Sequence, residues 1–115
     1  MRRGEVRVVR LDPVAGSEAA GKRPAVLVSN DGANSTAARL GRGAVTVVPL
    51  TSNIDLVHPF QVLLPAAETG LDSDSKAQAE QIRSVAVGRL GATISSLPLH
   101  LMVRIDDAVR LHLDL

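Results

Sequence analysis

The sequence contains no cysteine, no tryptophan and no tyrosine, and it has a single phenylalanine, Phe60. The absence of cysteine excludes disulfide bonds, thiolate metal sites and a cysteine nucleophile. Because aromatic rings are so scarce, the core has to be built from Val, Leu, Ile and Ala. Their scarcity also excludes nucleic-acid binding on a platform of stacked aromatic side chains, since only Phe60 could take part.

Long apolar runs are missing as well. No stretch reaches the roughly 18 consecutive apolar residues that a transmembrane helix needs. The N-terminus carries Arg2 and Arg3 with no apolar segment behind them, which does not fit a secretory signal peptide. We therefore expect a cytoplasmic protein with no membrane partner.

The 115 residues are enough for one compact domain, residues 1–115, and too few for two. The net charge is +1, but it is unevenly spread. Residues 1–50 carry eight Lys or Arg against four Asp or Glu, and residues 51–115 carry five against eight. This asymmetry fits a polyanionic partner, an acidic protein partner or a head-to-tail contact between copies of the chain.

Short apolar runs separated by turn residues predict a small β-rich fold. These runs predict strands at residues 6–11, 24–29, 43–50 and 60–64. Pro49 indicates that the third strand is an edge strand or ends there, because proline cannot donate to a ladder. Residues 12–22 form a loop that is longer than most connections, and residues 34–40 could hold a helical turn.

The C-terminal part predicts a helix, because apolar residues recur at three- and four-residue steps between Leu101 and His112. Ser95 and Ser96 offer an N-cap, with Pro98 in the first turn. Residues 75–87 are ambiguous, since their first half favours helix and their second half favours strand. The predicted fold class is mainly β (α+β), a compact barrel closed by the C-terminal helix.

Several short motifs do not indicate a function. Asn34-Ser35-Thr36 matches a glycosylation acceptor without a secretory signal, and residues 73–76 match S-x-x-K without its partner motifs. The three histidines, at 58, 100 and 112, lack the spacing of metal ligands. We therefore predict neither a metal nor a cofactor.

Polar groups at the ends of predicted strands are the remaining candidates. Arg23 opens the second strand, Thr51, Ser52 and Asn53 follow the third, and Ser75 and Gln81 come later. Arginine is a permanent cation whose planar donor fork suits phosphate oxygens, and hydroxyls can donate to the same oxygens. The alternative is a solvated arginine and an ordinary turn, because turns are rich in such residues.

With these residues in view, the sequence resembles the MazF/PemK toxin family, the ribonuclease halves of type II toxin–antitoxin modules. The resemblance covers almost the whole chain and consists of five pieces in the family's order and spacing. They are residues 3–6 (Arg-Gly-Glu-Val), 12–18 with Asp12-Pro13 and Gly16-Ser17-Glu18, 23–29 (Arg-Pro-Ala-Val-Leu-Val-Ser), 48–52 (Val-Pro-Leu-Thr-Ser), and 74–84 with Asp74-Ser75 and Glu80-Gln81-Ile82-Arg83-Ser84.

The resemblance implies a Src-homology-type β-barrel of the CcdB/Kid/MazF toxin fold, a homodimer, and a largely extended conformation for residues 76–84. It also implies metal-independent, sequence-specific cleavage of single-stranded RNA that leaves a 2′,3′-cyclic phosphate and a 5′-hydroxyl. The family's active-site arginine and threonine fall on Arg23 and Thr51. Its substrate-contacting serine and glutamine fall on Ser75 and Gln81, and Ser17 and Glu18 match RNA-touching loop positions.

In such a reaction the ribose 2′-hydroxyl attacks its own phosphodiester, and a fixed Arg23 would stabilise the charge that grows on the phosphoryl oxygens. The general base stays open, because arginine remains protonated and a threonine hydroxyl is a poor base. Glu18 is a candidate if the loop folds inward. The alternative is a solvated loop carboxylate.

The first strand departs from the family, which usually places an aromatic residue and an aspartate where this chain has Arg7, Val8, Val9 and Arg10. The added arginines raise the positive charge beside the loop. Base recognition would then depend on hydrogen bonds from Ser52, Asn53, Ser75, Gln81 and backbone groups rather than on stacking.

The expected inhibitor is a MazE-like antitoxin whose acidic, partly disordered tail folds over the barrel and covers Arg23. Two alternatives stay open. One is a non-catalytic gyrase poison on the same barrel, as in CcdB. The other is an inactive relative that only binds RNA or an antitoxin.

Overall fold

A computed structural model describes residues 1–13 and 15–115. The strands are β1 (Glu5–Arg10), β2 (Lys22–Leu27), β3 (Ala44–Thr51), β4 (Gln61–Leu64), β5 (Ser75–Gln78), β6 (Arg83–Ala86) and β7 (Leu90–Ser96). The helices are α1 (Asp31–Leu40), α2 (Ala66–Thr69) and α3 (Leu99–Leu113), with short 3-10 turns η1 (Ala79–Gln81) and η2 (Val87–Arg89). Among the described residues, no helix is both long enough and apolar enough to cross a bilayer.

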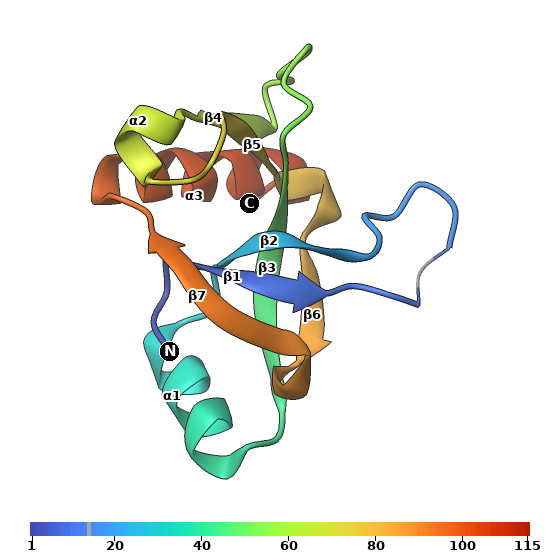
Figure 1. The fold of residues 1–115 in the computed structure, drawn as a ribbon, viewed down its shortest axis with the longest axis vertical. Coiled ribbons are helices and arrows are strands. Elements are labelled where there is room, and N and C mark those ends of the chain that lie inside the picture. The colour runs from blue at the N-terminus through green and yellow to red at the C-terminus, as the bar shows by residue number, and fades with distance from the viewer. Residues whose placement is uncertain (14) are drawn as a thin grey trace.

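The strands form one antiparallel, strongly curved sheet in the order β4-β5-β3-β2-β1-β7, with β6 also paired to β3 (Figure 1). β3 is therefore the central strand. One of its edges pairs with β2, and the other pairs first with β6 and then with β5. This mainly β fold with a C-terminal helix confirms the predicted fold class.

Pro49 lies inside β3 and is buried, so the prediction of an edge strand or strand end at this residue was wrong. β6 pairs with β3 up to Val47, and β5 takes over at Leu50. Pro49 falls between these two registers, where no strand borders β3 on that side. A missing backbone donor is tolerated there, because no ladder hydrogen bond depends on it.

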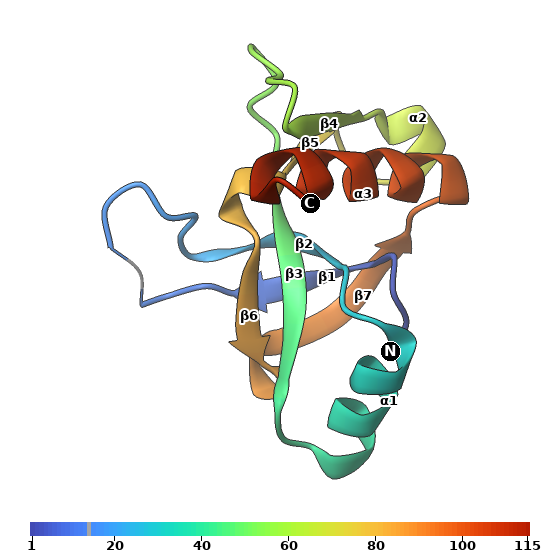
Figure 2. The ribbon, with the colours of Figure 1, turned by 180° about the vertical axis from the view of Figure 1, so that it is seen from behind.

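The core is aliphatic on both faces of the central strands. Val26 and Val48 belong to the cluster under α3, whereas Leu27 and Val47 belong to a second cluster on the opposite face. α3 closes the first cluster with its buried stripe of Leu101, Met102, Ile105 and Ala108. It packs against β4 and η1, while α1 lies at the other end of the molecule (Figure 2).

The helix α1 is longer than the predicted turn at residues 34–40, because it begins at Asp31. Asn30 is its N-cap, and the Asn30 side-chain oxygen accepts a hydrogen bond from the Ala33 backbone N at 2.8 Å. The helix ends at Gly41, which has a left-handed φ of 65° that favours glycine. Residues 30–32 thus start a helix.

The predicted cap of the C-terminal helix was wrong. Ser95 and Ser96 belong to β7, where they pair with Val6 and Glu5, and the Ser95 hydroxyl donates to the Thr69 carbonyl. α3 begins at Leu99, and Pro98 occupies the N-cap position without a side-chain cap. The sheet uses the backbone of the two serines, so they are not available to the helix.

The ambiguous segment 75–87 is extended apart from two short 3-10 turns, as the resemblance implies. β5 and β6 flank η1, and both strands pair with β3. The helix propensity at the start of this segment is overridden because Lys76 and Ala77 pair with the end of β3.

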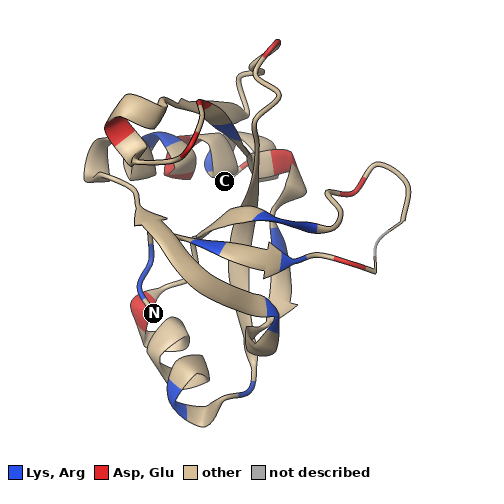
Figure 3. Ribbon diagram, viewed as in Figure 1, with Lys and Arg blue, Asp and Glu red and all other residues tan. Residues whose placement is uncertain are grey.

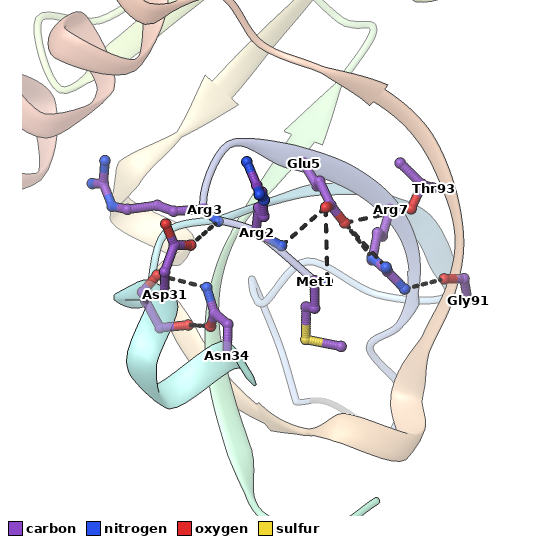
Figure 4. Close-up of polar contacts among 10 residues, drawn as sticks. Met1, Arg2, Arg3, Glu5, Arg7, Asp31, Asn34, Gly91 and Thr93 are labelled. Carbon is purple, nitrogen blue, oxygen red and sulfur yellow. Dashed lines mark hydrogen bonds and ion pairs between the residues drawn. The ribbon is translucent and has the colours of Figure 1, made fainter. Parts of the chain in front are cut away.

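The N-terminus is held by a group of charged residues that we call the N-terminal network: Arg2, Arg3, Glu5 and Arg7 (Figure 4). The Glu5 carboxylate accepts from the Arg2 backbone N at 2.9 Å and from Arg7 Nε at 3.0 Å. Arg3 bonds to Asp31 through its backbone N and to the Asp106 carboxylate of α3 through its guanidinium. The contacts of Arg3 join the segment before β1 to both α1 and α3.

Burial tends to raise the pKa of Glu5. The hydrogen bonds from the Arg7 side chain and the Arg2 backbone oppose this, as do the positive charges of the N-terminus and Arg7. The net result is a pKa below the ordinary value of 4.5. The N-terminal network therefore favours the ionised carboxylate.

Candidate active site

A pocket of about 380 Å³ opens where β2 begins and β3 ends. β2 contributes Lys22, Arg23 and Pro24, and the end of β3 contributes Leu50, Thr51 and Ser52. The remaining wall is made by Leu71, Asp72, Ser73, Ser75 and Ile94. Arg23, Thr51, Ser52 and Ser75, four of the residues selected from the sequence, therefore share one pocket.

The sheet register brings these residues together. Ala25 of β2 pairs with Pro49 of β3, and Thr51 pairs with Lys76 of β5. Continuing the first register by two residues places Arg23 beside Thr51. Continuing the second by one residue places Ser75 beside Ser52 on the far side. The pocket thus lies across three adjacent strands, β2, β3 and β5.

Arg23 is hydrogen-bonded through one guanidinium nitrogen, and the other two are free within the described chain. Its Nε donates to the Ala20 carbonyl at 3.1 Å, which fixes the guanidinium plane. Within the described chain, its two terminal nitrogens make no hydrogen bond or ion pair. The fork can therefore donate to an anion in the pocket with little reorganisation.

Thr51 has its hydroxyl oxygen engaged as an acceptor. The backbone N of Asn53 donates to Thr51 Oγ1 at 3.2 Å, as in a Ser/Thr turn. The hydroxyl hydrogen of Thr51 is therefore available for a hydrogen bond to a group bound in the pocket. Asn53 does not line the pocket, and its side-chain oxygen accepts from the Asp55 backbone N at 3.3 Å.

Ser75 is buried, with 9% of the residue exposed, and its hydroxyl donates to the Ser73 carbonyl at 3.1 Å. The oxygen lone pairs of Ser75 therefore remain available to a donor in the pocket. The same hydrogen bond shapes the short turn that brings Ser73 to the pocket wall.

Gln81 lies outside the pocket and holds the long loop between β1 and β2. Its side-chain oxygen accepts from the Ala19 backbone N at 2.9 Å, and its side-chain nitrogen donates to the Ser17 carbonyl at 3.2 Å. Ser17 and Glu18 are exposed on this loop, and neither lines the pocket. The inward fold that would bring Glu18 to the pocket is absent from the part of the loop that the structure describes.

Lys22, Asp72 and Ser73 line the pocket and were missed by the sequence analysis. Lys22 precedes Arg23, and Asp72 and Ser73 lie just before Ser75. Proximity to a selected residue was the one available signal. Among the residues described, no group of three or more His, Cys, Asp or Glu side chains could hold a metal ion.

The sequence and the fold match a known group of proteins. A family model described as PemK-like, MazF-like toxin of type II toxin–antitoxin system matches residues 2–113. The chain belongs to this family. The toxin is 61% identical to the Mycobacterium tuberculosis protein named endoribonuclease MazF9, over 100% of this chain and 98% of that protein. It is 34% identical to Bacillus subtilis endoribonuclease EndoA, over 100% and 96%.

Solved structures show the same fold at lower identity. A crystal structure of MazF from Deinococcus radiodurans superposes with a TM-score of 0.81 at 23% identity, covering 100% of this chain and 97% of that one. A mycobacterial endoribonuclease in complex with its cognate antitoxin superposes with a TM-score of 0.79, also at 23% identity, covering 100% and 96%.

The departures of this toxin in the first strand have structural explanations. Arg7 is partly buried, and it bonds to Glu5 and to the Gly91 carbonyl of β7 at 3.2 Å. It therefore binds β1 to β7. Arg10 is exposed and pairs with Lys22 across β1 and β2, so the ends of these two strands next to the loop are cationic (Figure 3). Of these two arginines, Arg10 adds to the positive charge next to the pocket residue Lys22.

Proposed function

We propose that this toxin is an endoribonuclease that cuts single-stranded RNA, and so blocks translation and growth. The observation that carries the proposal is that Arg23 and Thr51 line one pocket in a chain of the MazF-like family. mRNA is the main expected target, with tRNA and rRNA as further substrates. Residues 1–115 act as a single toxin domain that needs no metal or other cofactor.

In the proposed reaction a phosphodiester lies against Arg23, and the adjacent ribose 2′-hydroxyl attacks the phosphorus. Arg23 binds the non-bridging oxygens through the nitrogens left open by its bond to Ala20. The Thr51 hydroxyl donates a hydrogen bond to one of these oxygens. Both donors are fixed before substrate arrives, so their stabilisation of the transition state costs little reorganisation. The products are a 2′,3′-cyclic phosphate and a 5′-hydroxyl end.

Sequence selectivity is assigned to polar groups around this centre. Ser52 and Ser75 face the nucleotide in the pocket. Ser17, Glu18 and Gln81 contact the bases beyond it from the loop side, and Asn53 does so from the turn after β3. Hydrogen bonds replace aromatic stacking in this arrangement, since the chain has a single phenylalanine.

Two partners complete the proposal. One is a second copy of the chain, giving a homodimer. The other is a MazE-like antitoxin whose acidic, disordered tail pairs with the cationic ends of β1 and β2 and covers Arg23. Both act in the cytoplasm. The support for an antitoxin is the family's description and the charge of this surface.

The test is cleavage of single-stranded RNA by the purified toxin in EDTA, followed by analysis of the product ends. We expect 2′,3′-cyclic phosphate and 5′-hydroxyl ends, and no cleavage where the nucleotide before the cut carries deoxyribose. Arg23→Ala, purified identically, controls for contaminating nucleases and should lose the activity. Equal cleavage of the deoxyribose substrate would exclude attack by the 2′-hydroxyl.

A further inference from the structure

We infer that Asp72 is the general base of the proposed cleavage, and that Lys22, across the same pocket, is its general acid. The inference rests on the proposed function and deepens it. Neither residue was selected from the sequence, and both line the pocket that holds Arg23 and Thr51.

The order of the strands places these two groups on opposite flanks. β3 lies between β2 and β5 in the sheet. Lys22 and Arg23 stand on the β2 flank, Thr51 and Ser52 end the middle strand, and Asp72 lies in the turn that leads into β5. A phosphate held at the centre thus has a cation on one side and a carboxylate on the other. In-line displacement requires this separation, because the attacking and leaving oxygens lie on opposite sides of the phosphorus.

Asp72 is free to act, unlike the other carboxylates near it. It makes no hydrogen bond or ion pair with any residue that the structure describes, and it is exposed to the pocket. Asp74 instead accepts from the Ala66 backbone N at 2.8 Å, and Glu80 binds the Gln61 side chain at 2.7 Å. Glu18 lies outside the pocket, so Asp72 is the one carboxylate among the described lining residues.

The charged groups around Asp72 do not neutralise it within the described chain. Lys22 and Arg23 face it from β2, and no ion pair joins either of them to Asp72. Lys76 of β5 donates its Nζ to the Leu56 carbonyl at 2.5 Å. The charged residue nearest along its own turn, Asp74, is engaged at the start of α2. The β3 end and β7 contribute only uncharged residues to the pocket.

The step balances with these two groups. The Asp72 carboxylate accepts the proton of the 2′-hydroxyl as the new bond from O2′ to phosphorus forms. The bond from phosphorus to O5′ breaks, and the Lys22 ammonium gives its proton to O5′. Asp72 then returns its proton to water, and Lys22 regains one. Arg23 stays protonated throughout and holds the non-bridging oxygens.

The test compares Asp72→Asn with the wild type and with Asp55→Asn, an exposed carboxylate outside the pocket lining. We expect Asp72→Asn to lower kcat by about 10²–10⁴-fold. We expect the rate of the wild type, but not the remaining activity of Asp72→Asn, to decline at acidic pH. Binding of RNA with deoxyribose at the cut site should be unchanged. Formate should partly restore cleavage by Asp72→Ala.

Lys22→Gln provides the second arm. A substrate with sulfur in place of O5′ needs no proton on its leaving group, so it should be cut equally well by Lys22→Gln and the wild type. The normal RNA should be cut slowly by the variant. If Asp72→Asn keeps wild-type rates and pH dependence, or the sulfur substrate fails to rescue Lys22→Gln, the assignment is wrong. Failure of the wild type to cut RNA would instead reject the proposed function.

Discussion

Arg3 and Arg7 of the N-terminal network differ from Arg23 of the pocket in the hydrogen-bond partners of their guanidinium nitrogens. Arg3 and Arg7 make ion pairs with Asp106 and Glu5, and each also bonds to a backbone carbonyl. Arg23 bonds to one carbonyl through Nε. Paired charges join secondary-structure elements and contribute to stability, whereas a guanidinium left open at its fork is available to a substrate. Arginine side chains thus stabilise the fold or bind substrate, depending on whether their guanidinium groups already have partners.

Among the changes that test this comparison, the largest effect should come from replacing one arginine of each class with alanine. Arg23→Ala should lower the cleavage rate by about 10²–10³-fold, because it removes a fixed donor to the transition state. Its melting temperature should stay near that of the wild type. Arg7→Ala should do the reverse, losing stability and keeping the cleavage rate. Steady-state cleavage and thermal unfolding of both variants measure the comparison. A strong loss of stability in Arg23→Ala would contradict it.

Thr51→Val should have a smaller effect on rate, roughly tenfold or about 1.4 kcal/mol, since it removes a neutral donor and keeps the shape of the side chain. The lost turn bond from Asn53 should leave the fold intact because this turn is exposed. The measurement is kcat on a short RNA, with Thr46→Val as the control outside the pocket lining. Equal rates for both variants would remove the Thr51 hydroxyl from the mechanism.

Arg3→Ala should lower the free energy of unfolding by about 1 kcal/mol, because it removes a partly exposed ion pair to α3 and a hydrogen bond to Val28. Urea denaturation measures this change, and the cleavage rate at low denaturant should match the wild type. Arg104→Ala, an exposed arginine with no ion pair among the described residues, is the matched control. Equal stability of the two variants would show that the ion pair between Arg3 and Asp106 contributes nothing measurable to the free energy of unfolding.

The smallest effect concerns pH. The folded state holds the pKa of Glu5 below the ordinary 4.5, so the unfolded chain takes up a proton at higher pH than the folded one. The stabilisation by Glu5 is therefore complete above 4.5 and is lost as pH falls through the lower value of the folded state. Glu5→Gln should lose less stability than the wild type between pH 5 and pH 3 in urea titrations. Parallel losses would contradict the assignment.

The strands that sequence could predict are those made of β-branched residues. The runs around Val8, Val26 and Val47 each contain buried valines and lie inside the sheet, and each is recognisable without its neighbours. β7 was not predicted, because Gly91, Ser95 and Ser96 give it no apolar pattern and pairing with β1 is what makes it a strand. Pro49 was misinterpreted because its environment depends on β5 and β6, which are distant in sequence.

The candidate site follows the same division. The family resemblance located Arg23, Thr51 and Ser75, but no spacing in the sequence places Asp72 opposite Lys22. These two residues line the same pocket from opposite flanks because β3 lies between β2 and β5. Gln81 resembled a substrate contact, and the structure adds bonds from it to the loop backbone. The pairing of strands that are distant in sequence decides which residues line the pocket, and local sequence does not encode that pairing.

The change of partner along β3 has a consequence for how this protein can vary. Because three strands fix its register, deleting or inserting one residue between Ala44 and Thr51 would turn the threonine away from Arg23 and bury a polar group. The described residues of the connections at 11–21 and 52–60 belong to no strand, so no sheet register constrains their length. If these connections contact RNA as proposed, descendants of this chain can therefore change them, and with them the RNA that is recognised, while β3 stays unaltered.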